Sequence, residues 1–140
     1  MDTKDTKAIY KRMIDEAFNA GKLEVVDEVV SPNYVLHGAP PDMPKGPDAI
    51  RATVKTFRTA FPDLEIELQE LVAEGDKVSA RSVMRGTHEG PLFGIPATHK
   101  KVEVDGLTMV TVRDGRVQES WVKNDTLQLF QQLGVSPPGM

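Results

Sequence analysis

The spacing of apolar residues predicts three helices in the first half of the chain. Between residues 4 and 20 the apolar side chains recur at helical intervals and form one broad stripe, which ends at Gly21. A shorter helix is expected over residues 23–30, because the Ser-Pro pair that follows stops it. A third helix begins at Pro47, a residue that suits the first turn, and ends at Pro62. Its apolar face carries Ile50, Val54, Phe57 and Phe61.

Alternating apolar and polar residues predict strands in the second half. In residues 64–73 the apolar parity slips by one position, which a β-bulge near Gln69 or Glu70 would absorb. A Gly-Asp turn then leads into a strand over residues 77–87. Between the second and third helices, the segment 33–37 is long enough only for a short strand.

The last third of the chain, residues 101–133, is typical of a long β-hairpin that runs into a short helix. Asp114 and Gly115 form the strongest short hairpin signal in a sequence, because a primed turn needs positive φ and this pair tolerates it. The two arms are therefore expected to pair antiparallel, with a helix over residues 126–133 after them.

This order of elements predicts an α+β fold in which a curved antiparallel sheet wraps around helices. Such a sheet encloses a cone, and the open end of the cone is a natural site for a small molecule. At 140 residues the chain forms a single domain, residues 1–140, with tails at 1–5 and 135–140. The loop at 38–47, rich in Pro and Gly, is expected to cross the cone mouth as an apolar lid.

Composition and charge narrow the range of partners. The net charge is −4 and Lys and Arg do not cluster, so no nucleic-acid partner is expected. The chain has no cysteine, and its three histidines lack ligand spacing, so no metal site is expected. No apolar run has the length of a membrane span or the form of a signal peptide. We therefore expect a cytoplasmic protein with no membrane partner.

The hairpin offers a candidate pocket wall. Its returning arm places Glu119 and Trp121 on one parity, and ionisable groups beside the only tryptophan suit a pocket. The first arm is apolar on both faces, with Leu107 and Met109 opposite the valines, so one face looks into a cavity or meets a partner. Because the chain's own helices can cover only one face of the sheet, we expect a homodimer through the other.

Two of these side chains have more than one interpretation, and the third helix adds another candidate. Glu119 is either a second acid of the site or a buried partner of Arg81 or Arg85. Trp121 is a core residue, a platform for a ligand, or both. Phe57, on the apolar face of the third helix, is a candidate contact for the substrate.

Four segments of the chain carry a family resemblance: FNAGKLEVVDEVVSPNYVLHG, AFPDLEIELQELVAEGDKV, RGTHEGPLFGIPATHKKVEVDG, and RDGRVQESW followed by Asp125 and QQLG. They resemble the SnoaL-like polyketide cyclase and ester cyclase family of the nuclear transport factor 2-like superfamily, to which ketosteroid isomerase also belongs. The resemblance spans Lys7 to Gly134. It implies a cone-shaped α+β barrel and an enzyme that needs no metal or organic cofactor.

The chemistry implied by the resemblance is an intramolecular aldol closure of a polyketide methyl ester, with a carboxylate as general base. Asp125, four residues after Trp121, matches that carboxylate, and an apolar environment would raise its pKa toward a useful range. Aspartate is also a leading N-cap residue, and the spacing of Asp125 and Gln128 is that of a cap. Asp125 is thus a candidate base, a helix cap, or both. Many relatives carry histidine where this chain has Ser120.

The resemblance also implies roles for other polar residues. His37, just before the loop, is either a pocket residue or a structural one, and His88 is either a loop residue or a pocket residue. His37 or Asn124 would hydrogen-bond the oxyanion that develops as the proton leaves. Two functions stay open: a cyclase or isomerase acting on a small apolar carbonyl compound, or a non-catalytic binding protein for a small hydrophobic ligand.

Overall fold

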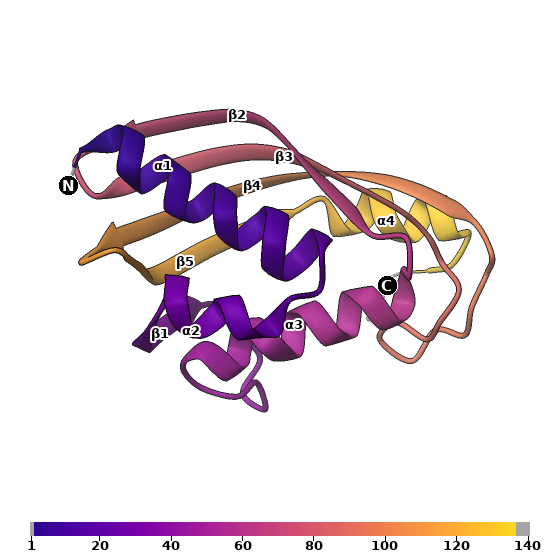
Figure 1. Ribbon diagram of the computed structural model, residues 1–140. Coiled ribbons are helices and arrows are strands. Elements are labelled where there is room, and N and C mark those ends of the chain that lie inside the picture. Colours follow the sequence, from indigo (N-terminus) through magenta and orange to yellow (C-terminus); the bar gives the residue numbers. More distant parts are fainter. Residues whose placement is uncertain (1, 137–140) are drawn as a thin grey trace.

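The computed structural model describes residues 2–136 and shows a curved five-stranded sheet with helices packed on it (Figure 1). The expected α+β class is confirmed. The order of the strands in the sheet is β1-β5-β4-β3-β2. In chain order their bounds are β1 (Val30–His37), β2 (Glu65–Glu74), β3 (Lys77–Thr87), β4 (Lys101–Arg113) and β5 (Arg116–Asn124).

The N-terminal helix begins at Thr3, within the stretch that was expected to be a tail. Asp2 caps it, because its carboxylate accepts a hydrogen bond from the backbone N–H of Asp5 at 2.9 Å. The chain is α-helical over α1 (Thr3–Arg12) and continues as a π-helix over Met13–Asn19. The predicted helix is therefore present, but its second half has the wider turn of a π-helix. The expected C-terminal tail lies mostly outside the described residues.

A short helical segment precedes the first strand. It consists of a 3-10 turn (Leu23–Val25) and α2 (Val26–Val29). β1 begins earlier than expected, since Val30 already pairs with Val117 of β5. The Ser-Pro pair, which was expected to stop the helix, therefore lies within the strand. An edge strand tolerates proline because one side of it needs no ladder hydrogen bonds.

The two remaining helices lie where the sequence predicts them. The bounds of α3 are Pro47–Ala60, with proline in the first turn. Those of α4 are Thr126–Leu133, and Gly134 ends it with a φ of 75°. The Asp-Gly hairpin turn is also confirmed, because Asp114 and Gly115 have φ angles of 55° and 75°.

One edge of the sheet differs from the expectation of a wholly antiparallel sheet. β1 pairs parallel to β5, while β5, β4, β3 and β2 pair antiparallel to their neighbours. Parallel neighbours need a long connection, and here α3 and three strands lie between them in the sequence. This pairing places the end of β1 beside the middle of β5.

Two bulges set which side chains face inward. The pairing of β2 with β3 shifts between Leu68 and Glu70, so the predicted bulge in β2 is confirmed. A second bulge, which was not predicted, lies in β5. Val112 of β4 pairs with Val117, and Thr111 of β4 pairs with Glu119. Gln118 therefore has no paired residue on β4. The bulge reverses the alternation of β5 after Val117.

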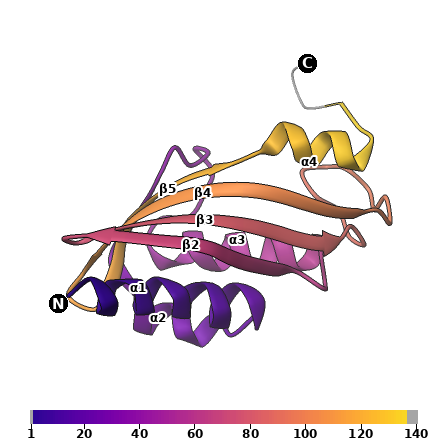
Figure 2. The ribbon, with the colours of Figure 1, turned by 90° about the horizontal axis from the view of Figure 1, so that it is seen from above.

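The helices cover the sheet unevenly. Figure 2 shows α1 and α2 together on one side of the sheet, with α4 apart from them where β5 ends. α1 packs on β2, β3 and β4, α3 packs on β1, and α4 packs on β4. One buried apolar cluster joins the N-terminal helix, α2 and α3 to the sheet, and another joins the end of α3 to α4.

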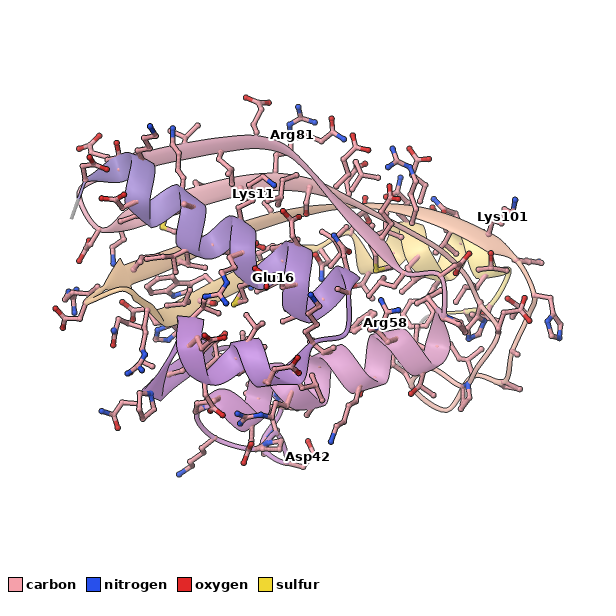
Figure 3. All side chains as sticks on the ribbon, viewed as in Figure 1. Lys11, Glu16, Asp42, Arg58, Arg81 and Lys101 are labelled. Atoms are coloured by element: carbon pink, nitrogen blue, oxygen red, sulfur yellow. The ribbon has the colours of Figure 1, made fainter. Side chains whose placement is uncertain are left out.

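Arg58 of α3 holds the end of the π-helix in place. Its Nη1 donates hydrogen bonds to the backbone oxygens of Phe18 and Asn19, at 3.0 and 2.9 Å (Figure 3). The Asn19 side chain in turn donates to the backbone oxygen of Ile66 in β2 and accepts from its N–H, at 2.9 and 2.7 Å. The π-helix, α3 and β2 are therefore fixed to one another at one end of the molecule.

Within residues 2–136, no helix is long and apolar enough to cross a membrane.

Candidate functional site

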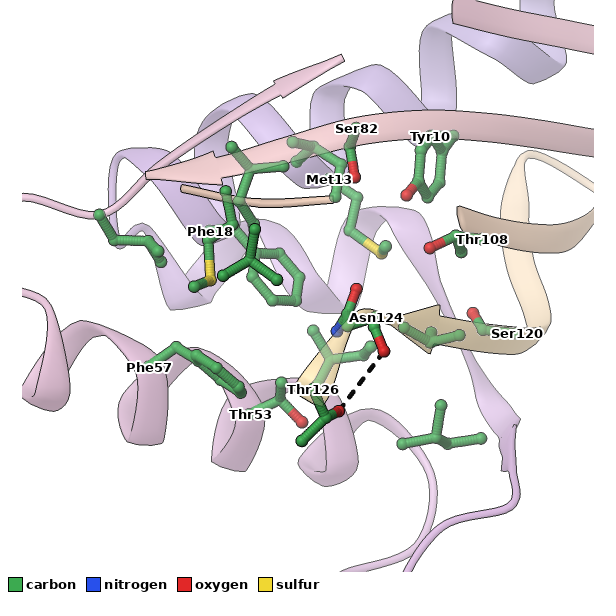
Figure 4. A pocket seen from close by; sticks show the side chains of 18 of the residues that line it. Tyr10, Met13, Phe18, Thr53, Phe57, Ser82, Thr108, Ser120, Asn124 and Thr126 are labelled. Carbon is green, nitrogen blue, oxygen red and sulfur yellow. Dashed lines mark hydrogen bonds between the residues drawn. The ribbon is translucent and has the colours of Figure 1, made fainter. Parts of the chain in front are cut away.

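A cavity of about 260 Å³ lies among the N-terminal helix, α3 and the inner face of the sheet (Figure 4). Most of its wall is aliphatic or aromatic, and the part of the chain that the structure describes contributes no Asp, Glu, Lys, Arg or His to it. Apolar walls with a few polar groups are typical of a site for a small organic molecule. The polar groups are Tyr10, Tyr34, Thr53, Ser82, Thr108, Ser120, Asn124 and Thr126.

Helical spacing brings side chains of two helices to this wall. Residues three and four apart on a helix share a face. The N-terminal helix therefore presents Tyr10, Met13 and Ile14 together, and α3 presents Ile50, Thr53 and Phe57. Phe57 was expected to contact a substrate, and the structure places it in the wall.

One row of the sheet carries a polar patch that faces the cavity. Ser82 of β3 pairs with Gly106 of β4, which in turn pairs with Asn124 of β5. A side chain at Gly106 would collide with the Asn124 amide and would lie 3.3 Å from the Ser82 hydroxyl. Because glycine has no side chain, the Asn124 side chain can occupy this space. Figure 4 shows that amide extending into the cavity.

Tyr34 of β1 brings a buried hydroxyl to the cavity wall. The residue is buried, at 3% exposure, and its Oη makes no hydrogen bond with any residue that the structure describes. Burial raises the pKa of Tyr34, and an interaction with the Ser120 side chain, too long or too bent to be a hydrogen bond of good geometry, opposes part of that rise. The phenol is therefore neutral near pH 7 and can donate a hydrogen bond.

Tyr10 of α1 supplies a second neutral phenol. Burial raises its pKa to about 12, although Thr108 beside it acts in the opposite direction. Figure 4 shows the hydroxyls of Tyr10 and Thr108 turned toward each other. The cavity therefore holds two phenols and several hydroxyls that can donate hydrogen bonds without carrying charge.

Phe93 lies at the exposed end of the cavity wall. It is 58% exposed and meets Phe57 edge to face, with ring centroids 6.2 Å apart. Its φ of 49° lies in the left-handed region, which is unfavourable for an aromatic residue. The loop at 38–47, expected to be the lid, instead borders a separate groove beside β1 and adds nothing to the cavity wall. The lid prediction for that loop is wrong.

Asp125, the expected base, caps α4. Its Oδ1 accepts a hydrogen bond from the backbone N–H of Gln128 at 3.0 Å, and the residue is exposed. It is not part of the cavity wall, although its neighbours Asn124 and Thr126 both are. Its Oδ2 accepts no hydrogen bond from the described residues. The cap interpretation is confirmed, and a role as base stays a prediction.

His37, Glu119 and Trp121 lie together outside the cavity wall, which corrects the expected pocket face. His37 stacks on Trp121, with ring centroids 4.4 Å apart and planes 8° apart, and its Nε2 lies 2.9 Å from Glu119 Oε1. The cause is the bulge at Gln118, after which Ser120, Val122 and Asn124 face the cavity in place of Glu119 and Trp121.

Glu119 is also paired differently from the expectation. Its Oε2 accepts a hydrogen bond from Thr111 at 2.8 Å and lies 3.6 Å from Lys77 Nζ, whereas Arg81 and Arg85 pair with other glutamates. The hydrogen bonds from His37 and Thr111 lower the pKa of Glu119 to about 2. The carboxylate is therefore ionised throughout the physiological range.

The last two expected contacts also lie away from the cavity. Met109 pairs with Trp121 across β4 and β5 and is 43% exposed. His88 is fully buried, and its Nδ1 accepts from the backbone N–H of Thr98 at 3.2 Å. Burial lowers the pKa of His88, so the imidazole is neutral and anchors the loop that carries Phe93.

Comparison with known proteins agrees with this geometry. Residues 8–133 match the family model described as SnoaL-like polyketide cyclase. The chain belongs to this family. It is 32% identical to the aklanonic acid methyl ester cyclase DnrD of Streptomyces peucetius over 130 residues, which cover 90% of this chain and 88% of that protein.

Two solved structures have a similar fold. TsrD from Streptomyces laurentii has a TM-score of 0.89 and 29% identity, covering 97% of this chain and 99% of that one. IdmH from Streptomyces antibioticus has a TM-score of 0.80 and 34% identity, covering 93% of this chain and 99% of that one. The nuclear transport factor 2-like fold expected from the sequence is thus shown.

Sequence reasoning missed the hydroxyls of this SnoaL-like cavity. From the sequence, Tyr10 was interpreted as part of an apolar helical stripe and Tyr34 as part of a short strand. Ser120 entered only as a position where many relatives have histidine. The alternation of β5 could have identified Ser120 and Asn124 together, had the bulge between Val117 and Glu119 been recognised.

Proposed function

We propose that this protein is a cyclase that closes a ring within a small, largely apolar, carbonyl-bearing polyketide ester. The observation that carries the proposal is the apolar cavity with neutral hydrogen-bond donors, in a chain that is 32% identical to a methyl ester cyclase. The cavity wall suits a substrate that is mostly hydrocarbon with a few oxygen atoms.

The cavity would act first by folding the substrate. Holding the two reacting carbons of one molecule in contact lowers the entropic part of the barrier to ring closure. The aromatic and aliphatic wall supplies this positioning, and Asn124 with the hydroxyls fixes the orientation of the oxygens. Neutral donors aimed at a carbonyl oxygen also stabilise the negative charge that develops there.

Asp125 is the base in this proposal. It would take a proton from the carbon next to a carbonyl, and the resulting enolate carbon would attack a keto carbon of the same molecule. The new alkoxide then takes back the proton that Asp125 removed, so the reaction needs no co-reactant. Asp125 lies between two residues of the cavity wall and has one carboxylate oxygen without a hydrogen bond from the described residues. Capping and proton transfer are therefore compatible.

One observation favours a second function, the binding of a hydrophobic ligand without chemistry. Within the described residues, the cavity wall holds no carboxylate and no imidazole. A protein that only sequesters a ligand needs the apolar wall and the neutral donors, but not the base. A cyclase would convert the ligand into a ring-closed product, whereas a binding protein would release it unchanged.

The test uses the substrates named for the relatives, aklanonic acid methyl ester and nogalonic acid methyl ester. Each is incubated with the purified protein, and ring closure is followed by liquid chromatography with mass detection, together with binding by calorimetry. Turnover that falls in Asp125→Asn supports the cyclase. Binding without turnover of either ester favours the binding protein. Absence of binding to any apolar carbonyl compound would contradict both.

A further inference from the structure

The hydroxyl of Tyr34 is a buried donor that makes no hydrogen bond of good geometry within residues 2–136. We propose that it is the group that binds a carbonyl oxygen of the ligand. The proposal rests on the proposed function in one respect, because it requires that the cavity receive an organic ligand.

The first support for it is the cost of an unpaired hydroxyl. Buried polar groups in proteins are nearly always hydrogen-bonded, so an exception calls for an explanation. Tyr34 is 3% exposed and lines the cavity, and its Oη has no hydrogen bond within the described part of the chain. A phenylalanine would fill the same space without that cost. A ligand oxygen in the cavity would supply the missing acceptor.

The second support is the position of Tyr34 in the sheet. β1 pairs with β5 so that Leu36 lies beside Ser120, and Tyr34 shares the inner face with Leu36. The hydroxyls of Tyr34 and Ser120 therefore enter the cavity from adjacent strands. An acceptor between them would receive two neutral hydrogen bonds.

The third support is the charge of the site. The described wall offers no cation to balance a bound carboxylate, and an uncompensated buried anion is strongly unfavourable. Tyr34 stays protonated near pH 7 because burial disfavours its anion. The group it binds is accordingly the oxygen of a neutral ketone or ester.

The experiment compares two probes of the same shape, fluorenone with a carbonyl and fluorene without one. Their affinities are measured by calorimetry for the wild-type protein, Tyr34→Phe and Tyr10→Phe. Tyr34→Phe should weaken fluorenone binding roughly three- to tenfold, the usual effect of one neutral hydrogen bond, and leave fluorene binding unchanged. Its melting temperature should hardly change, because the hydroxyl makes no hydrogen bond of good geometry in the part of the chain that the structure describes.

A spectroscopic measurement separates hydrogen bonding from shape. The carbonyl stretching frequency of bound fluorenone should be lower in the wild-type protein than in Tyr34→Phe. Equal loss of affinity for both probes, an unchanged frequency, or selective loss only in Tyr10→Phe would overturn the proposal for Tyr34. If neither probe binds the wild-type protein, the proposed function fails and this inference fails with it.

Discussion

The carboxylate of Asp125 accepts a hydrogen bond from the backbone N–H of Gln128 at 3.0 Å, and this bond starts α4. The Gln128 side chain accepts in turn from the backbone N–H of Asp105 in β4, at 3.0 Å. The cap therefore also ties α4 to the sheet, next to the Asn124 side of the cavity.

Asp125→Asn should separate the cap from the base. Asparagine caps as well as aspartate, so the free energy of unfolding should hardly change, whereas kcat for ring closure should fall by roughly two to four orders of magnitude. Asp125→Ala should lose the same activity and also about 0.5–2 kcal/mol of stability. Chemical denaturation and steady-state kinetics measure the two effects.

Asp2 provides the matched control for this pair of variants. It caps α1 through the same kind of bond, to Asp5 at 2.9 Å, and it is not part of the cavity wall. Asp2→Asn should change neither stability nor rate. An unaltered rate in Asp125→Asn, with the fold intact, would mean that Asp125 is a helix cap alone.

Glu119 should make stability depend on pH in the acidic range. Its pKa is about 2 in the folded protein, below the ordinary 4.5, so the unfolded chain binds the proton more readily. The stabilisation is thus fully present above pH 4.5 and is lost as the pH falls toward 2. Glu119→Gln should flatten the curve of unfolding free energy in that window. Identical curves for the variant and the wild-type protein would contradict the pairing.

Much of the fold could be predicted because its signals are local. The Asp114-Gly115 turn, the bulge in β2 and the bounds of α4 each depend on a few neighbouring residues, and the structure has all three. The parallel pairing of β1 with β5 depends on contacts between distant segments, which no local pattern encodes. The π-helix could not be predicted either, because the apolar residues were compared only with the spacing of an α-helix.

The site was predicted less well for a single physical reason. Val117 is buried, so simple alternation would turn Glu119 and Trp121 inward beside it. The extra residue Gln118 instead turns Ser120 inward, and the charged side chains leave the cavity. A one-residue register change moves every later side chain to the opposite face. Phe57 and Asn124 lie in the wall, and the other expected pocket residues do not.

Gly106→Ala should disturb the cavity without removing a polar group. The added methyl would occupy the place of the Asn124 amide, which must then move out of the polar row. We expect weaker fluorenone binding, by roughly three- to tenfold if one hydrogen bond to the ligand is lost. Calorimetry measures this loss, and Asn124→Ala should show a similar one. Full affinity in both variants would exclude the Asn124 amide from ligand binding.

The homodimer expected from the sequence would use the outer face of the sheet. Leu107 and Met109 lie there at 59% and 43% exposure, beside Trp121 on β5. A charge at Met109 should oppose the burial of this face in a dimer. Sedimentation should show a dimer for the wild-type protein at about ten to a hundred micromolar, a concentration at which an obligate dimer persists, and a monomer for Met109→Lys. Leu127→Lys, on α4, is the control, and a wild-type monomer would contradict the prediction.

Phe93 should control how fast a ligand leaves the cavity. Its ring meets Phe57 at the exposed end of the wall, so both Phe93→Ala and Phe93→Gly should raise the dissociation rate of fluorenone in stopped-flow experiments. The two variants should differ in stability, because the φ of 49° is unfavourable for alanine and free for glycine. Phe93→Gly should be more stable than Phe93→Ala by about 1–2 kcal/mol, the ordinary cost of a left-handed residue. Equal stability would show that the loop relaxes when the ring is removed, and unchanged dissociation rates would show that the ligand leaves elsewhere.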